Sequence, residues 1–526
     1  MLYKQTKIAS GLFTLAISLF IYKHNQYKIE NKKSLCFSDL NENFKKRIIN
    51  KETDFYVWGK GHVENTSVYT NFHPHRIKKL NSDEKIIPKN ILDITFNEHL
   101  AAAIDKNFNL FVWREPKLNS EKNKEINNHE RNKVMRLALN LKVVNVTFTK
   151  DKLFVLDKNG NVYFYNITIT QPQNQEFFAS ALPEPEVELN KNIVHIKELK
   201  NIVKISTGKD HFIAVDKEGK VYGMGDDSFG QLGLGTFTDQ REQYMKMYSN
   251  FIERRERLPK LIEIPEKVKK VVCGENHTLA LTEHGNVYGF GYNRFLQLSN
   301  DPLYRQGLLG LNKPTIIPSD KFKNMKVIDI AASKNCSYFV CKNETDGAYY
   351  FFSAGEGLRG QLGQNVIKHM SDVEEMPDIS GLINSESLKP FEPLKLKCGL
   401  NHCILLFKNP RVLYVWGNNE FGELGTKDRV FYESPIPMLE EYTLPFNILN
   451  FGVGAMNSAF ICEKVDSEKK KKILAEDLRM YEEEIKSKKT KKKGTKKKES
   501  EEKKKEESSE WKNKIYQVLN NLKKYI

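Results

Sequence analysis

The chain has 526 residues, of which 40% are hydrophobic and 29% charged, with 30 Gly, 18 Pro and 7 Cys. This composition excludes a collagen-like repeat, a disulfide-dense scaffold and a polytopic membrane protein, and it indicates a largely globular chain. Residues 467–526 hold 21 Lys/Arg against 12 Asp/Glu, so much of the net charge of +16 belongs to the carboxyl-terminal end. The remainder of the chain is only mildly basic.

The amino-terminal run of residues 8–22 is apolar, carries no charge and has lysines on both sides. A helix of about 15 residues is about 22 Å long, shorter than the roughly 30 Å hydrocarbon core, so spanning would need bilayer thinning or snorkelling lysines. No A-x-A-like cleavage site follows, which favours an uncleaved anchor. We therefore predict a targeting segment and membrane-anchor helix in residues 1–28 and a linker in residues 29–53. The apolar residues expected to contact the membrane are Leu12, Phe13, Leu15, Ile17, Leu19, Phe20 and Ile21.

The residues around this run indicate the cellular compartment to which the chain is targeted. No acidic residue precedes Glu30, and the first 29 positions carry Lys, Ser and Thr. This pattern is compatible with mitochondrial targeting followed by a stop in the inner membrane, and a signal anchor in the endoplasmic reticulum is the alternative. The orientation stays open, because the lysine distribution and a mitochondrial stop-transfer route point in opposite directions.

One pattern recurs between residues 54 and 464: an apolar strand, a Gly or small residue, a polar link, a second apolar strand, a turn and an aromatic strand. Alternation at period 2 and turns such as Asn159-Gly160 predict antiparallel hairpins. The copies in chain order are residues 54–61, 91–115, 143–166, 202–227, 271–293, 327–355, 394–419 and 448–464. The first copy has only the closing strand and the last only the opening pair, so together they complete a seventh unit.

A small antiparallel sheet cannot bury both faces alone, so such sheets pack against one another around an axis, and an open ring would leave apolar surface wet. The sequence therefore predicts an all-β fold, a seven-bladed β-propeller over residues 54–464. Pairing of N-terminal and C-terminal strands should close the ring, with the segment Asp54–Gly59 beside the segment Ala459–Cys462.

One polar position recurs ahead of the second strand of the units and could suggest a metal or catalytic array. Its occupants are His99, Lys152, His211, His277, Cys336, His402 and Asn457. Because the position accepts Lys, Cys and Asn, and because equivalent positions of different blades are separated around a ring, we interpret these histidines as structural, buried and bonded to turn carbonyls.

Other signals of chemistry are weak. The glycines of residues 289–293 open no helix and precede no Gly-Lys-Ser/Thr, so a phosphate-binding loop is not indicated. No nucleophile elbow, H-E-x-x-H or supported carboxylate pair is found. We therefore expect no enzyme, with no catalytic residues, no metal site and no cofactor. The odd cysteine count and the absence of C-x-x-C predict reduced thiols, most of them buried in strands.

The closing strands of several units carry a family signature. The segments GKVYGMGDDSFGQLGLG, residues 219–235, and LYVWGNNEFGELG, residues 413–425, resemble the repeat of the regulator of chromosome condensation family, and residues 290–299 and 357–363 are further copies. Members of this family are seven-bladed propellers. The units ending in Trp113 and Tyr165 lack the Gly-Gln-Leu-Gly close, which puts any functional loop of those two blades in doubt.

Four connections are longer than a tight turn requires: residues 114–142, 167–201, 236–267 and 364–393. The third predicts a short amphipathic helix, either packed on its own propeller or bound to a partner. Its apolar residues at helical spacing are Tyr244, Met247, Tyr248, Phe251 and Ile252, with Arg254, Arg255 and Arg257 behind them.

The carboxyl-terminal region, residues 465–526, is rich in Lys and Glu. Residues 486–510 lack the apolar surface needed to fold and predict a solvated tether. An amphipathic helix follows, which would need a partner groove, an anionic membrane surface or its own propeller to bury its stripe. The candidate partner-binding residues are Trp511, Ile515, Leu519 and Leu522.

These features together predict a membrane-anchored, non-enzymatic propeller scaffold that binds other protein subunits, contacts the membrane through residues 8–22 and has no specific nucleic-acid partner. The layout resembles the mitochondrial branches of the family implicated in assembly or stability of inner-membrane respiratory complexes, which implies a subunit or assembly factor there. The alternative is a guanine-nucleotide exchange factor for a small GTPase, as the nuclear founder of the family is. A nuclear chromatin binder conflicts with residues 8–22.

Overall fold

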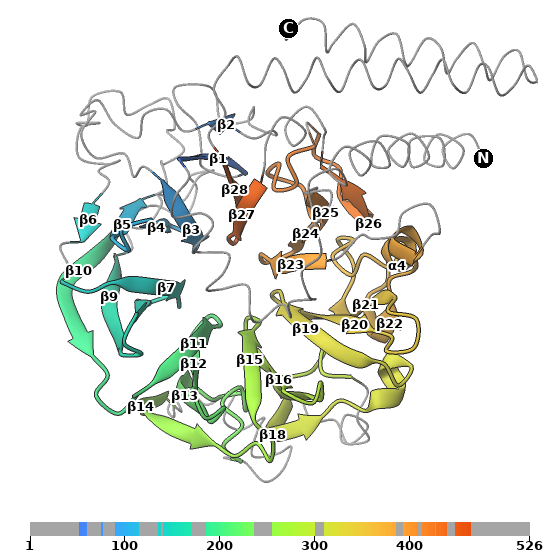
Figure 1. Cartoon of the computed structure of the whole chain (residues 1–526), viewed down its shortest axis with the longest axis horizontal. Helices are drawn as coiled ribbons and strands as arrows, with labels where there is room; N and C mark the ends of the chain where they lie inside the picture. The colour runs from blue at the N-terminus through green and yellow to red at the C-terminus, as the bar shows by residue number, and fades with distance from the viewer. Residues whose placement is uncertain are drawn as a thin grey trace, which may run out of the picture.

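The computed structural model is all-β and consists of seven four-stranded antiparallel sheets arranged around a central axis (Figure 1). It describes residues 52–59, 75–76, 90–114, 135–137, 140–170, 186–235, 255–299, 310–384, 393–407, 413–426, 428–438 and 448–463. Within these residues the helices are α4, Pro377–Asn384, and the 3₁₀ turn η2, Ser319–Phe322. The predicted seven-bladed propeller is confirmed.

The first four blades are as follows, each from its innermost strand outward. Blade I is β27 (Ile448–Val453), β28 (Asn457–Glu463), β1 (Thr53–Gly59) and β2 (His75–Arg76). Blade II is β3 (Ile91–Phe96), β4 (Leu100–Asp105), β5 (Leu110–Arg114) and β6 (Met135–Leu137). Blade III is β7 (Val143–Phe148), β8 (Lys152–Asp157), β9 (Val162–Thr170) and β10 (Glu186–His195). Blade IV is β11 (Ile202–Thr207), β12 (His211–Asp216), β13 (Val221–Asp226) and β14 (Arg255–Ile262).

Three further blades complete the ring. Blade V is β15 (Val268–Cys273), β16 (His277–Thr282), β17 (Val287–Tyr292) and β18 (Gly310–Ile316). Blade VI is β19 (Lys326–Ala332), β20 (Cys336–Lys342), β21 (Tyr349–Glu356) and β22 (Met370–Glu375). Blade VII is β23 (Pro393–Cys398), β24 (His402–Phe407), β25 (Leu413–Gly417) and β26 (Tyr432–Pro437).

Blade I closes the ring as predicted. Strand β1 pairs antiparallel with β28 from Thr53 opposite Glu463 to Gly59 opposite Asn457, and this register includes Asp54 opposite Cys462. One sheet therefore joins strands from the two ends of the propeller, so both ends are held by backbone hydrogen bonds as well as by packing.

The outermost strands lie within the long connections. Strands β6, β10, β14 and β22 are the fourth strands of their blades and fall in the four connections expected to be loops. Arg255 and Arg257 belong to β14, so they do not flank a helix as predicted. The apolar residues of that predicted helix, from Tyr244 to Ile252, lie outside the described residues.

The core lies between neighbouring blades. Each second strand is buried along its length, and large aromatic side chains fill the gaps, with Trp58, Trp113 and Trp416 each at most 1% exposed. Between blades VI and VII, Tyr338 and Trp416 pack edge to face with ring centroids 6.1 Å apart. Burial of one such side chain contributes about 2–3 kcal/mol, so the blades stabilise one another.

The recurring histidine position joins adjacent blades through hydroxyl groups. His211, His277 and His402 place Nε2 at 3.0, 3.1 and 2.9 Å from the hydroxyl oxygens of Thr278, Ser337 and Ser458, each in the next blade. A glycine precedes each histidine by three residues, since a Cβ there would lie within 2.4 Å of the imidazole Cε1. The structural interpretation of these three histidines is confirmed, but their Nε2 partners are hydroxyls of the next blade.

The histidine register needs one correction. The backbone bond that closes the turn before the second strand runs from Gly208 N to His211 O in blade IV and from Asn97 N to Leu100 O in blade II. Leu100, and not His99, is therefore the equivalent residue. The alignment of the repeats placed the marker of blade II one residue too early because its turn begins with Asn97 in place of glycine. The Asn97 side chain accepts hydrogen bonds from the backbone of His99 and Leu100.

The cysteines follow the prediction in part. Cys336, Cys341 and Cys462 are buried and form no disulfide, and Cys273 is half-buried and forms none. Cys398 and Cys403 form a disulfide, so the prediction of reduced thiols is wrong for this pair. The two residues lie directly opposite each other across the β23–β24 hairpin, a proximity that the five-residue spacing does not reveal until the register is known.

The predicted membrane anchor in residues 1–28 and the carboxyl-terminal region from residue 465 lie outside the described residues. Among the residues that the structure does describe, no helix has the length and apolar character that a membrane crossing requires.

Candidate protein-docking face

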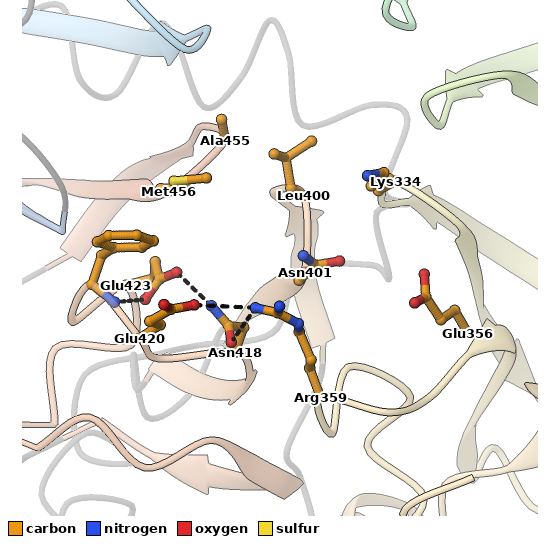
Figure 2. A pocket seen from close by; sticks show the side chains of 11 residues that line it. Lys334, Glu356, Arg359, Leu400, Asn401, Asn418, Glu420, Glu423, Ala455 and Met456 are labelled. Carbon is orange, nitrogen blue, oxygen red and sulfur yellow. Dashed lines mark hydrogen bonds and ion pairs between the residues drawn. The ribbon is translucent and has the colours of Figure 1, made fainter. Parts of the chain in front are cut away.

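A cleft of about 400 Å³ opens where blades VI, VII and I meet (Figure 2). We call the surface around it the Arg359 face. Its lining residues are Lys334, Glu356, Arg359, Leu400, Asn401, Asn418, Glu420, Phe421, Glu423, Ala455 and Met456. They come from two kinds of segment, the turns that join first and second strands and the loops that follow third strands.

The turns around the axis are linked to one another by their backbones. Lys334 N donates to Leu400 O at 3.0 Å, and Leu400 N donates to Ala455 O at 3.3 Å. The same bond recurs from Lys150 to Lys209, from Lys209 to Glu275 and from Glu275 to Lys334. Because successive turns hold each other, this face of the ring is built on a fixed frame.

The loops after the third strands are held to the next blade. The carbonyl oxygen of Gln361 accepts from Trp416 Nε1 of the next blade at 3.0 Å and from Tyr338 Oη of its own blade at 2.7 Å. The carbonyl oxygen of Glu423 accepts from Trp58 Nε1 at 2.7 Å and from Ser458 Oγ at 2.9 Å. The Gly-Gln-Leu-Gly signature therefore marks loops whose position is set by buried donors, most of them from the neighbouring blade.

Blade VII carries a variant of this loop. In blade IV, Gln231 Nε2 donates to Asp226 Oδ2 at 2.6 Å. In blade VII, Glu423 replaces this glutamine at the second position of the Gly-Gln-Leu-Gly signature. Asn418 Nδ2 donates to Glu423 Oε1 at 2.8 Å, and Phe421 N donates to Glu423 Oε2 at 2.8 Å. The donor and acceptor have exchanged places. Burial raises the pKa of Glu423, and these bonds to its carboxylate oppose that rise.

Arg359 is the more exposed of the two cations that line the cleft. Its Nη1 lies 3.3 Å from Asn418 Oδ1 and 3.2 Å from Glu420 Oε2, while its side chain stays 52% exposed. An exposed pair of this kind contributes at most about 1 kcal/mol, so a partner's carboxylate can displace Glu420 at little cost. Across the cleft, Lys334 is 3.5 Å from Glu275 and Glu356 accepts from Asn335 at 2.9 Å.

Exposed apolar side chains lie on the loop that carries Arg359, between β21 and β22, and on the loop between β25 and β26. They are Leu358, Val366, Ile367, Val430 and Phe431, which are between 37% and 53% exposed. The first of these loops is tied to β26, the strand that follows the second, where Asn365 N donates to Glu433 O at 2.9 Å. An arginine amid exposed aliphatic and aromatic side chains on a rigid support is the composition of a protein-binding surface.

The described residues offer little for catalysis or metal binding. They hold no group of three or more His, Cys, Asp or Glu side chains placed to bind a metal. His211, His277 and His402 are fully buried, and burial lowers the pKa of each to about 3, so they are neutral and out of reach of a substrate.

The sequence-predicted site residues are not on this face. The membrane-anchor residues from Leu12 to Ile21 and the partner-binding candidates Trp511, Ile515, Leu519 and Leu522 lie outside the described residues. Sequence reasoning missed Arg359, although the signal was present: the segment GLRGQLG places an arginine at the tip of a loop of known rigidity, next to an apolar residue.

Comparisons with known proteins agree with this geometry. A family model described as Regulator of chromosome condensation (RCC1) repeat matches residues 218–281, and a second model with the same description matches residues 202–231 and 268–297. These matches fall on blades IV and V.

Curated relatives match parts of the chain. Over 261 residues it is 27% identical to Protein FMP25, mitochondrial, of Saccharomyces cerevisiae, a match covering 43% of this chain and 40% of that protein. Over 241 residues it is 30% identical to Protein RCC2 homolog of Xenopus laevis, covering 42% and 40%. A third relative is the E3 ubiquitin-protein ligase HERC2 of Homo sapiens, 25% identical over 333 residues, or 62% of this chain and 6% of that protein. The matches thus span less than half the length of each relative.

Two solved structures share the fold. Prp20p from Saccharomyces cerevisiae aligns with a TM-score of 0.58 at 19% identity, covering 82% of this chain and 97% of that chain. Human WBSCR16 aligns with a TM-score of 0.55 at 17% identity, covering 79% and 100%. At these identities the likeness is one of architecture.

Proposed function

Because the chain belongs to the regulator of chromosome condensation repeat family, we propose that it is a non-enzymatic scaffold that docks another protein on its Arg359 face. One observation carries this proposal: an exposed arginine and five exposed apolar side chains share two loops whose backbones are fixed by the next blade. A rigid surface of this kind binds without first having to be ordered, which favours stable association.

We place the scaffold at the mitochondrial inner membrane, as a subunit or assembly factor of a respiratory complex. The support is the charge pattern of the first 29 residues, the apolar run of residues 8–22 and the partial similarity to the yeast protein named FMP25, mitochondrial. In this proposal residues 8–22 anchor the chain, residues 486–510 act as a tether, and the stripe from Trp511 to Leu522 binds a neighbouring subunit.

The docking proposal is tested by reversing one charge. Arg359→Glu should weaken co-purification of the partner from detergent-solubilised mitochondria at least tenfold, because a carboxylate beside Glu420 repels an acidic partner group. Arg257→Glu is the matched control, since Arg257 is exposed on β14, the outer strand of blade IV. Equal recovery of the partner with both variants would refute docking at this face.

The membrane and tail proposals need separate experiments. The full chain should resist carbonate extraction from mitochondria and co-migrate with a large complex. A chain lacking residues 505–526 should stay in the membrane, keep a folded propeller and lose the neighbouring subunit. Recovery of the full chain in the carbonate supernatant would contradict the anchor, and unchanged co-migration of the shortened chain would contradict the role of the tail.

The same preparation addresses nucleotide exchange, the alternative function. Prp20p has binding properties to Gsp1p and histones, but the structural likeness to it is one of fold. Purified full-length chain should leave the rate of nucleotide release from small GTPases unchanged. Accelerated release by a soluble pool of the protein would replace the scaffold proposal with exchange activity.

A further inference from the structure

The innermost strands of all seven blades carry a polar or charged position that faces the axis. In each first hairpin the register shifts by one residue near the start of the inner strand. The residue after each shift belongs to one axial ring, consisting of Asp93, Asn145, Lys204, Lys270, Asp329, Lys395 and Asn450. These shifts are β-bulges, which turn a side chain away from the plane of its sheet.

Side chains of this ring meet across the axis. Asn450 Nδ2 of blade I donates to Asp93 Oδ1 of blade II at 3.0 Å and to Leu92 O at 2.8 Å. Lys397 of blade VII, two residues beyond the ring position, lies 3.4 Å from the same Asp93 oxygen. Blade I lies between blades VII and II in the ring (Figure 1), so this last contact links two blades that are not neighbours.

Between blades V and VI, the charges of the ring are balanced. Lys270 Nζ of blade V lies 2.6 Å from Asp329 Oδ1 of blade VI and donates to Ile330 O at 2.8 Å. The Asp329 side chain is 1% exposed, so its partner ammonium satisfies a buried charge. This pair therefore has no excess charge to offer a ligand.

The sector at blade VII carries an excess of positive charge. Lys395 and Lys397 have one carboxylate, Asp93, near both of them, and Lys395 Nζ donates to the neutral Asn450 Oδ1 at 2.7 Å. Both ammonium groups also lie about 6 Å from the Phe451 ring, Lys395 at 5.9 Å and Lys397 at 6.0 Å from its centroid. Burial, followed by the charge of Lys397, lowers the pKa of Lys395 to about 7, and Lys270 adds to the repulsion while Asp93 opposes it.

We propose that Lys395 and Lys397 form a binding site for an oxyanion of the phosphate type on the inner strand of blade VII, with Lys395 Nζ and Lys397 Nζ as donors. Two ammonium groups against one carboxylate leave a net positive charge that favours an anion, and Lys397 remains 30% exposed, so small solutes reach the site. The group bound is a phosphate, either free or at the end of a nucleotide.

Sulfate is the first probe because it stays a dianion over the whole useful pH range. Isothermal titration of the full chain at constant ionic strength should show one sulfate per chain at pH 7, and Lys395→Met should weaken binding at least tenfold. Lys397→Met serves as the second variant if the first fails to fold. Lys260→Met is the matched control, because Lys260 is exposed on the outermost strand of blade IV. Undetectable sulfate binding at 10 mM, or equal binding by Lys395→Met and Lys260→Met, would overturn the site.

Proton uptake that accompanies sulfate binding distinguishes a binding role of Lys395 from a purely structural one, because a structural role would not produce it. At pH 8 Lys395 is mostly neutral, and a bound dianion raises its pKa, so titrations in buffers of different ionisation enthalpy should show uptake of about one proton per sulfate. The charged groups facing Lys395 are Lys397 on its own strand, Asp93 on β3 and Lys270 on β15, with Asp329 on β19 paired to Lys270. Uptake that is unchanged in Lys395→Met would refute the assignment.

The source of the phosphate is decided by competition. Inorganic phosphate and ADP are each titrated against sulfate-loaded protein. Displacement by inorganic phosphate alone identifies a free-ion site, and displacement by ADP at lower concentration identifies a nucleotide site. Failure of both to displace sulfate would overturn the proposal.

Discussion

Acidification should destabilise this propeller through its three buried histidines. Burial lowers the pKa of His211, His277 and His402 from 6.5 to about 3. In the unfolded chain each imidazole takes up a proton near pH 6.5, whereas in the folded protein each stays neutral down to about pH 3. Between these values the unfolded state binds more protons, so the free energy of unfolding falls as the pH falls.

The magnitude follows from the same values. Between pH 7 and pH 5 each histidine lowers the free energy of unfolding by about 2 kcal/mol, so the three together lower it by about 6 kcal/mol. A domain typically has a free energy of unfolding of about 5–15 kcal/mol, so this loss is a large share of the total. The Nδ1 atoms of His211 and His277 are buried without a partner among the described residues, which is consistent with imidazoles that do not accept a second proton.

Urea denaturation at pH 7, 6 and 5, followed by tryptophan fluorescence, measures this loss. His277→Gln keeps a side-chain donor within reach of Ser337 and removes one titrating group, so the loss between pH 7 and pH 5 should shrink by about 2 kcal/mol. His284→Gln is the matched control, because His284 is exposed two residues after the same strand. A pH dependence that is identical in wild type and His277→Gln would show that the buried imidazoles do not govern acid stability.

Three further predictions concern closure, backbone and redox state. Trp58→Ala should lower the free energy of unfolding by about 3–5 kcal/mol in urea titrations, because Trp58 is fully buried in the strand that closes the ring; a loss below 1 kcal/mol would contradict that role. Gly225→Ala should cost about 3 kcal/mol against about 1 for Gly347→Ala, since both have positive φ but a Cβ at Gly225 would lie 2.4 Å from a backbone oxygen and one at Gly347 meets nothing within 4 Å; equal midpoints would count against the contact. Of the seven cysteines, the Cys398–Cys403 pair should stay unreactive towards a thiol reagent in denatured, unreduced protein, leaving five to react; seven reactive thiols would exclude the disulfide.

The histidine position shows how far repeat reasoning extends. In this chain a hydroxyl follows the marker position of each blade that comes after a histidine-bearing blade: Thr278, Ser337 and Ser458. Where the marker is Cys336 the next blade has Cys403, and no hydroxyl pairing arises. This correlation is visible in the sequence once the blades are aligned, but its cause, a bond between neighbouring blades, requires the ring.

The Arg359 face shows where such reasoning ends. Arg359, Asn418 and Met456 come from blades VI, VII and I and are separated by up to about a hundred residues, so no local pattern links them. The same holds for Lys397 and Asp93, which are 304 positions apart and come into contact although blade I lies between their blades. The sequence shows which residue types are present. Whether they lie close together depends on the number of blades and on the bulges that aim the side chains.

The amino-acid sequence by itself determined the hairpin, its sevenfold repetition and the closure by Asp54–Gly59, because period-2 burial, glycine turns and a split unit are local properties that recur. The tertiary structure decided the fourth strand of each blade, the hydroxyl partners of the histidines and the charge balance of the axis. These depend on contacts between blades, where side chains distant in sequence exclude water together and share hydrogen bonds. Local conformational propensity determines each hairpin, whereas the proposed docking face and the proposed anion site depend on residues that several blades bring together.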